Sequence, residues 1–107
     1  MNDAEIARTE SAFRELNEAI ATTAAKFEAD EAELICECAD PACADRMTVE
    51  LHDYEEVRAE ATRFLLVPGH AQQHVEEVVE STPEFDVVDK TAPAAAAVAR
   101  ALDPRAA

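Results

Sequence analysis

Large apolar residues recur at helical spacing through the first thirty positions of the chain. Four of them stand seven residues apart and would form one narrow seam on a helix: Ile6, Phe13, Ile20 and Phe27. Asn2 and Glu5 have the spacing of a capping box, and neither Gly nor Pro interrupts the segment. The pattern predicts an amphipathic helix in residues 1–31, with Leu16 on the apolar face and acids and arginines on the opposite face.

This apolar seam leaves two interpretations open. It packs onto the rest of a small domain, or it pairs with a helix from an unidentified protein partner or from a second copy, which would give a homodimer. Thr9 and Thr23 occupy the intervening heptad positions. Polar residues there would weaken a coiled coil.

Short alternating segments dominate residues 32–90. Six elements are expected there in chain order: a strand over 33–38, a strand over 46–50, a helix over 51–62, a strand over 64–67, a short helix from near Gln72 through Val79, and a strand over 85–89. Regular helix–strand repeats are missing, so we predict an α+β fold with a small, mostly antiparallel sheet and one or two short helices.

Alanine and proline dominate residues 91–107, which we predict to be a C-terminal tail. Pro93 and Pro104 bracket one short helix. Val98 and Leu102 are its only bulky apolar residues. The tail is therefore expected either to dock through those two side chains or to stay mobile.

Acidic residues outnumber basic ones, with 24 Asp and Glu against 9 Lys and Arg, which gives a formal net charge of −15. Such a charge argues against direct binding of nucleic-acid phosphates or of an anionic membrane. No apolar run is long enough to span a bilayer, and the first residues lack the apolar core of a secretion signal. We therefore expect a cytoplasmic protein.

All three cysteines, Cys36, Cys38 and Cys43, fall within eight consecutive positions. In a cytoplasmic protein, such clustering favours metal or redox chemistry over a structural disulfide. Cys36 and Cys38 would point to the same face of an extended segment. A turn at Asp40-Pro41 would bring Cys43 back toward them, so that three sulfurs face one point.

A structural zinc site needs a fourth ligand besides three thiolates. We favour His70, which follows Pro68 and the only glycine of the chain, Gly69, where the backbone can turn sharply. His74, His52, a water molecule, a carboxylate and the absence of a fourth ligand remain alternatives.

Four motifs carry a family resemblance: Cys36-Glu37-Cys38-Ala39-Asp40-Pro41-Ala42-Cys43, Asp53-Tyr54-Glu55-Glu56-Val57-Arg58, Thr62-Arg63-Phe64 and Pro68-Gly69-His70. In this order they resemble a family of small uncharacterised proteins common in high-GC Gram-positive bacteria. The resemblance covers about residues 34–90, and Asp103-Pro104-Arg105 also fits. Asp53 replaces a more usual Glu, and Ala61 stands where Pro often precedes the Thr. The resemblance implies four metal ligands: Cys36, Cys38, Cys43 and His70. It carries over no activity.

The sequence predicts a small, non-enzymatic protein with a structural Zn²⁺ site, acting as a protein-interaction or regulatory module. One alternative is a thiol-based redox or metal sensor, or a metal-handling protein. A zinc-dependent enzyme is the second alternative, and the chain contains neither His-Glu-x-x-His nor a glycine-rich phosphate loop nor Gly-x-Ser-x-Gly. We assign no catalytic residues.

Overall fold

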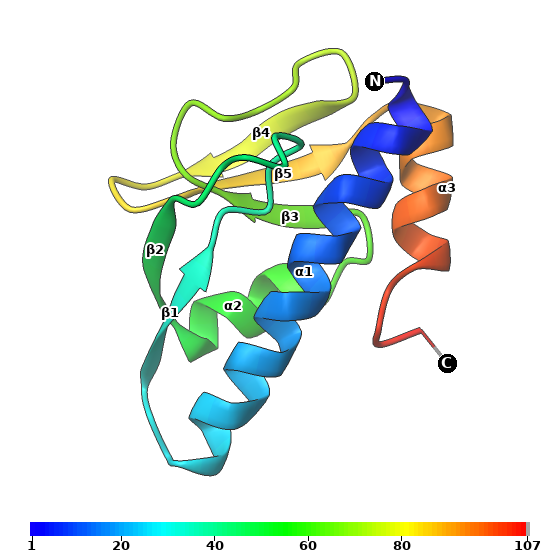
Figure 1. The fold of residues 1–107 in the computed structure, drawn as a ribbon. Coiled ribbons are helices and arrows are strands. Elements are labelled where there is room, and N and C mark those ends of the chain that lie inside the picture. Colours follow the sequence, from blue (N-terminus) through cyan, green and yellow to red (C-terminus); the bar gives the residue numbers. More distant parts are fainter. Residues whose placement is uncertain (107) are drawn as a thin grey trace.

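A computed structural model describes residues 1–106 and shows a long helix followed by short strands and two shorter helices (Figure 1). The elements, in order, are α1 (Asp3–Lys26), β1 (Glu31–Ile35), β2 (Arg46–Glu50), α2 (Leu51–Arg58), β3 (Arg63–Leu66), β4 (Glu76–Ser81), β5 (Asp86–Lys90) and α3 (Pro93–Ala101). The α+β fold is confirmed. Among the described residues, no helix has both the length and the apolar character needed to cross a bilayer.

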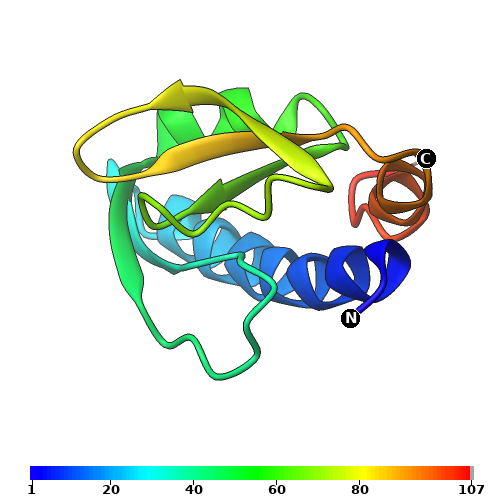
Figure 2. The same cartoon turned by 90° about the horizontal axis from the view of Figure 1, so that it is seen from above.

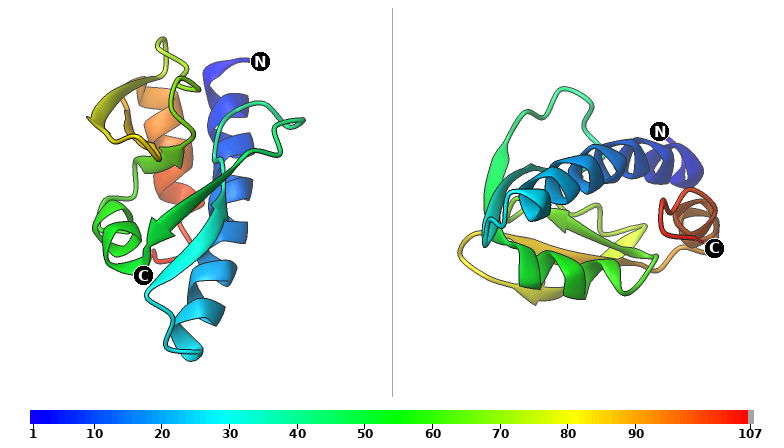
Figure 3. Two further views of the ribbon diagram at one scale, coloured as in Figure 1. Left: turned by 90° about the vertical axis from the view of Figure 1, so that its left-hand side faces the viewer. Right: turned by 90° about the horizontal axis from the view of Figure 1, so that it is seen from below.

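The strands form two antiparallel sheets, a β1–β2 hairpin and a three-stranded sheet in the order β3-β5-β4. Helix α1 lies along one face of the larger sheet, and α3 packs beside the N-terminal half of α1 (Figure 2). Helix α2 lies on the opposite side (Figure 3). Phe64, Leu66 and Val88 accordingly pack with the cysteine loop, whereas Leu65 and Val87 pack with residues of α2.

The start of α1 has the predicted capping box. The Glu5 N–H donates to Asn2 Oδ1 at 2.8 Å, and the Asn2 N–H donates to the Glu5 carboxylate at 3.2 Å. The predicted seam is only partly buried, because Ile6 is inside, whereas Leu16 is 54% and Phe27 81% exposed.

The side of α1 next to the seam differs from the prediction, because several polar residues there point into the protein. Four are buried: Glu10, Ser11, Arg14 and Asn17. Arg14 donates to the backbone carbonyls of Ala61 and Ala99 and lies 4.4 Å from the centre of the Phe64 ring. These contacts replace the hydrogen bonds to water that the guanidinium loses when it is buried.

A second buried group on this face joins three charged side chains, which we call the Lys90 cluster: Glu10, Glu76 and Lys90. The Lys90 ammonium contacts both carboxylates. Helix α1 is thereby tied to β4 and β5 through charges. The prediction that acids and arginines occupy the face opposite the seam is wrong for Glu10 and Arg14, which are buried.

The short helix expected from near Gln72 through Val79 is also wrong, because residues 72–75 form only a turn and Glu76–Ser81 form β4. Its residues pair with β5, with an irregular register between Val78 and Glu80. Val78 and Val79 are exposed rather than buried. Pairing with the buried strand β5 therefore overrides a helical spacing that only three valines supported.

Helix α3 confirms the expected short helix, and Val98 packs against the core as expected, but Leu102 does not dock and three alanines contribute instead. Ala95, Ala96 and Ala99 are buried, whereas Leu102 is 47% exposed. Small side chains let α3 approach its neighbours closely, so the alanines take part in the contact. Residue 107 of the predicted tail lies outside the described residues.

Ion pairs fasten the chain after α3. Buried Arg58 contacts Glu18 and Asp103, and Arg105 contacts Glu18 and Glu55. These contacts join the tail to α1 and α2.

Candidate metal centre

The cysteine loop begins where β1 ends. The Cys36 N–H donates to the Asp45 carbonyl at 3.0 Å, and the Glu37 N–H donates to the Leu65 carbonyl at 2.9 Å. The backbone therefore bonds to the hairpin at Cys36 and to β3 at the next residue, Glu37. The predicted strand over 33–38 is too long at its C-terminal end, so Cys36 and Cys38 lie in the loop.

A tight turn brings Cys43 back toward the first two cysteines. The Ala42 N–H donates to Asp40 Oδ1 at 2.9 Å, and the Cys43 N–H donates to the Asp40 carbonyl at 3.0 Å. Pro41 occupies the second position of this turn, which its fixed φ favours. The Asp40-Pro41 sequence thus positions Cys43 as predicted.

A second turn presents His70 from the end of β3. The His70 N–H donates to the Val67 carbonyl at 3.2 Å, and Gly69 has φ +88°. Pro followed by a residue with positive φ is typical of a type II turn. The Gly69 N–H also donates to Asp86 Oδ2 at 3.1 Å, which holds the turn against β5.

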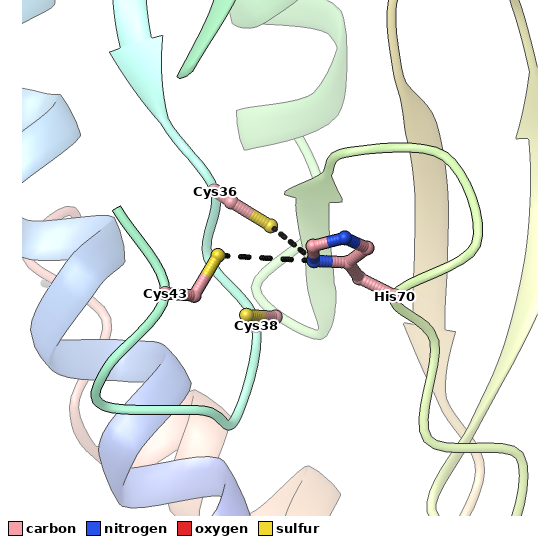
Figure 4. A group of neighbouring side chains, drawn as sticks. All are labelled: Cys36, Cys38, Cys43 and His70. Carbon is pink, nitrogen blue, oxygen red and sulfur yellow. Dashed lines mark hydrogen bonds between the residues drawn. The ribbon is translucent and has the colours of Figure 1, made fainter. Parts of the chain in front are cut away.

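The two turns bring the four predicted side chains together (Figure 4). One ligand atom from each of them lies within 4.8 Å of the others: Cys36, Cys38, Cys43 and His70. His70 Nδ1 is 3.5 Å from Cys36 Sγ and 3.8 Å from Cys43 Sγ. A tetrahedral zinc ion separates a sulfur and a nitrogen ligand by about 3.6 Å, and two sulfur ligands by about 3.8 Å. The spacing therefore suits one tetrahedral ion.

Burial makes the cysteine thiols difficult to ionise without a cation. Cys36 and Cys38 are buried, and Cys43 and His70 are half-buried. Burial raises the pKa of both the Cys36 and the Cys38 thiol, and neighbouring sulfur groups raise the pKa of Cys36 further. The Val67 N–H, 3.2 Å from Cys36 Sγ, opposes this by favouring the thiolate. A bound cation would supply the missing positive charge.

The second ring nitrogen of His70 points toward a carboxylate. His70 Nε2 lies 3.6 Å from Asp45 Oδ2, while Nδ1 lies on the side of the sulfurs. A carboxylate beside the outer nitrogen of a ligating histidine orients the ring and increases its basicity. No pattern in the sequence marks Asp45 for this role.

The other two histidines lie elsewhere on the surface. His52 Nε2 is 3.1 Å from Glu56 Oε1 on α2, and His74 is exposed. Neither belongs to the cysteine group. Among the three histidines, only His70 reaches the sulfurs.

Asn17, on α1, supports the cysteine loop. This role was not predicted from the sequence. The side-chain amide of Asn17 forms hydrogen bonds with the backbone N–H and carbonyl of Ile35. The same amide donates to Glu37 Oε2 at 2.8 Å. Glu37 also accepts from the Leu65 N–H at 2.9 Å, and burial raises its pKa to about 7. No sequence motif marks Asn17, because its role depends on which face of α1 is buried.

A cavity of about 270 Å³ opens beside the group and is lined by Cys38, Asp40, Gly69 and His70, among others. Part of the site is therefore accessible from solvent. Comparisons with protein-family models, with curated proteins and with solved structures gave no match to this chain.

Proposed function

We propose that this chain is a cytoplasmic zinc-binding protein in which Cys36, Cys38, Cys43 and His70 hold one structural ion. The convergence of their four ligand atoms within 4.8 Å of one another supports this proposal most strongly. Thiolate and imidazole ligands suit zinc, and four protein ligands leave no coordination position for a substrate.

The ion would fasten two turns that are far apart in the sequence. Three ligands belong to the loop between β1 and β2, and His70 belongs to the turn after β3. Zinc would thus join the hairpin to the larger sheet. We infer that the protein acts by binding another macromolecule through a surface outside the metal site.

Metal content tests this proposal. The protein would be purified under reducing conditions without added metal, and zinc would be measured by mass spectrometry for the wild type, Cys43→Ser, His70→Ala and His74→Ala. We expect one zinc per chain in the wild type and in His74→Ala. Both ligand variants should lose zinc or bind it much more weakly, with loss of native structure.

His74→Ala is the matched control, because this exposed histidine lies four residues from His70 and outside the cysteine group. Wild-type protein that is metal-free yet folded would contradict the proposal. Full zinc retention and unchanged folding in His70→Ala would show that the coordination shell has an open position, and the enzyme alternative would then merit assays.

The half-exposed Cys43 and the cavity beside Cys38 favour a second candidate function, a thiol-based sensor. In that case peroxide would oxidise two thiolates to a disulfide, peroxide would be reduced to water, and the ion would be released. Titration of the zinc-loaded protein with hydrogen peroxide separates the two functions. Retention of zinc in a large excess of peroxide would contradict sensing.

A further inference from the structure

Strand β1 has one long edge without a partner strand among residues 1–106. The Cys36 N–H donates to the Asp45 carbonyl, and the Leu51 N–H donates to the Asp30 carbonyl, so Cys36 and Asp30 bond toward the β2 side. Bonding direction alternates along an antiparallel strand. The backbone groups of Glu31, Glu33 and Ile35 therefore point to the other side, away from β2.

The side chain of Asn17 occupies part of that outer edge. The Ile35 N–H donates to Asn17 Oδ1 at 2.9 Å, and Asn17 Nδ2 donates to the Ile35 carbonyl at 2.8 Å. An amide side chain thus takes the place of a neighbouring strand at Ile35. The backbone groups of Glu31 and Glu33 continue the same edge beyond Asn17.

An apolar groove runs beside this edge, between β1 and the second half of α1. It has a volume of about 500 Å³, and its lining consists mainly of small residues: Ala19, Ile20, Thr23, Ala24, Ala32 and Glu33. Leu16 and Phe27, on the same face of α1, are exposed. The volume is in the range of ordinary ligand sites.

The charge around the groove distinguishes between a second copy of this chain and a basic partner segment. Acidic side chains on and next to β1 are exposed: Glu28, Asp30, Glu31 and Glu33, of which Glu33 lies 3.8 Å from Arg46 across the hairpin. A second copy would bring the same acids and a net charge of −15 to the contact. Charged residues on an edge strand discourage pairing between like chains. A basic segment, in contrast, would be attracted.

We propose that the groove between α1 and β1 binds an extended segment of a partner protein, which adds to β1 as a third strand. Its alternate side chains would be apolar, to pack beside Ile20 and Ala24, and basic, to lie next to Glu31 and Glu33. This binding site lies outside the metal centre, and it goes beyond the proposed function by stating what kind of partner is bound.

Binding of a designed peptide tests the proposal on the full chain, loaded with zinc and checked for metal content. The probe is an acetylated seven-residue peptide that alternates Lys and Val, and the control peptide alternates Glu and Val. We expect only the Lys peptide to bind, and we expect it to slow hydrogen exchange of the Glu33 amide at least tenfold. Absence of slowing at Glu33 would overturn the proposal.

Backbone methylation separates strand addition from simple charge attraction. In an antiparallel arrangement the lysines opposite Glu33 point their N–H groups at β1, so N-methylation of the lysines should abolish binding and N-methylation of the valines should not. A parallel arrangement would reverse this result. Full binding by both methylated peptides would overturn the proposal.

Filling the groove provides the matched variants. Ala19→Trp places bulk at an exposed position in the groove, whereas Ala25→Trp places the same bulk at an exposed position of α1 that is not part of the groove lining. We expect at least tenfold weaker binding in Ala19→Trp alone. Equal weakening in both variants, or a dimer in sedimentation that Ala19→Trp dissociates, would overturn the proposal.

Discussion

Two groups of polar side chains lie inside this protein and differ in the origin of their positive charge. The Lys90 cluster contains its own cation, an ammonium between the carboxylates of Glu10 and Glu76. The candidate metal centre groups three thiols and one imidazole, and in the proposed function its positive charge would come from a bound ion.

This difference determines how each group contributes to the fold. The Lys90 cluster is complete once α1, β4 and β5 have packed together, and it needs nothing from solution. If the candidate metal centre holds an ion as proposed, stability should depend on metal supply, because a bound ion stabilises only the folded state that assembles its ligands. Disruption of the two groups should therefore have different signatures.

Metal removal should have the largest effect. Treatment of the reduced protein with a chelator should lower its free energy of unfolding by an amount on the order of 10 kcal/mol, comparable with the whole stability of a small domain. Thermal unfolding followed by circular dichroism, with and without the chelator, measures this effect. Added zinc should restore the thermal unfolding transition. An unchanged unfolding midpoint after complete zinc removal would contradict the expected dependence of stability on metal.

Removal of the internal cation should have the next largest effect. Lys90→Met leaves two buried carboxylates without their ammonium partner and should cost about 3–5 kcal/mol in free energy of unfolding. Urea unfolding of zinc-loaded protein measures the loss. Lys26→Met, at an exposed position at the end of α1, is the matched control and should change little. Similar values for the two variants would show that the Lys90 cluster is not a stabilising unit.

The pH dependence of the free energy of unfolding should show a smaller effect of the Lys90 cluster. Burial raises the pKa of Glu76 from 4.5 to about 7. The folded state thus keeps this proton where the unfolded chain has lost it, and the free energy of unfolding should fall as pH rises from 4.5 to about 7.

Glu76→Gln removes this titration while keeping the size of the side chain. The stability of the variant relative to the wild type should therefore rise across that pH range, as urea unfolding between pH 4.5 and about pH 7 would show. Zinc binding by the thiols also depends on pH, but this dependence is common to both proteins and cancels in the difference. A constant difference would exclude the raised pKa.

The exposed ion pairs of the tail should matter least. The Arg105 guanidinium lies 2.6 Å from Glu55 and 2.7 Å from Glu18, but such pairs at the surface contribute about 1 kcal/mol or less. We expect Arg105→Ala to cost no more than this, and the cost to shrink with added salt. A double-mutant cycle with Glu55→Gln in low and high salt measures the pair, and a large salt-independent coupling would contradict this expectation.

Local signals in the sequence predicted much of the fold and the group of candidate ligands. The capping box at Asn2 marks the start of α1, the Asp40-Pro41 turn explains the return of Cys43, and Gly69 marks the turn before His70. Each of these features depends on residues that are close in sequence, so a short window contains the physical cause.

The wrong predictions concern contacts between distant segments. Glu10 and Arg14 look like surface residues until their partners Lys90 and Phe64, on strands far along the chain, are placed beside them. Likewise, the pairing of β4 with β5 is invisible from the spacing of three valines. Tertiary partners decide such cases, and a single sequence does not display them.

The distribution of the four candidate ligands along the chain also has a consequence for biosynthesis. Cys36, Cys38 and Cys43 leave the ribosome almost together, but His70 follows Cys43 by 27 residues. A nascent chain can therefore offer an ion three thiolates before β3 exists, since closing a short loop costs little entropy. We expect metal capture to begin during translation, with His70 completing the site only when its turn emerges.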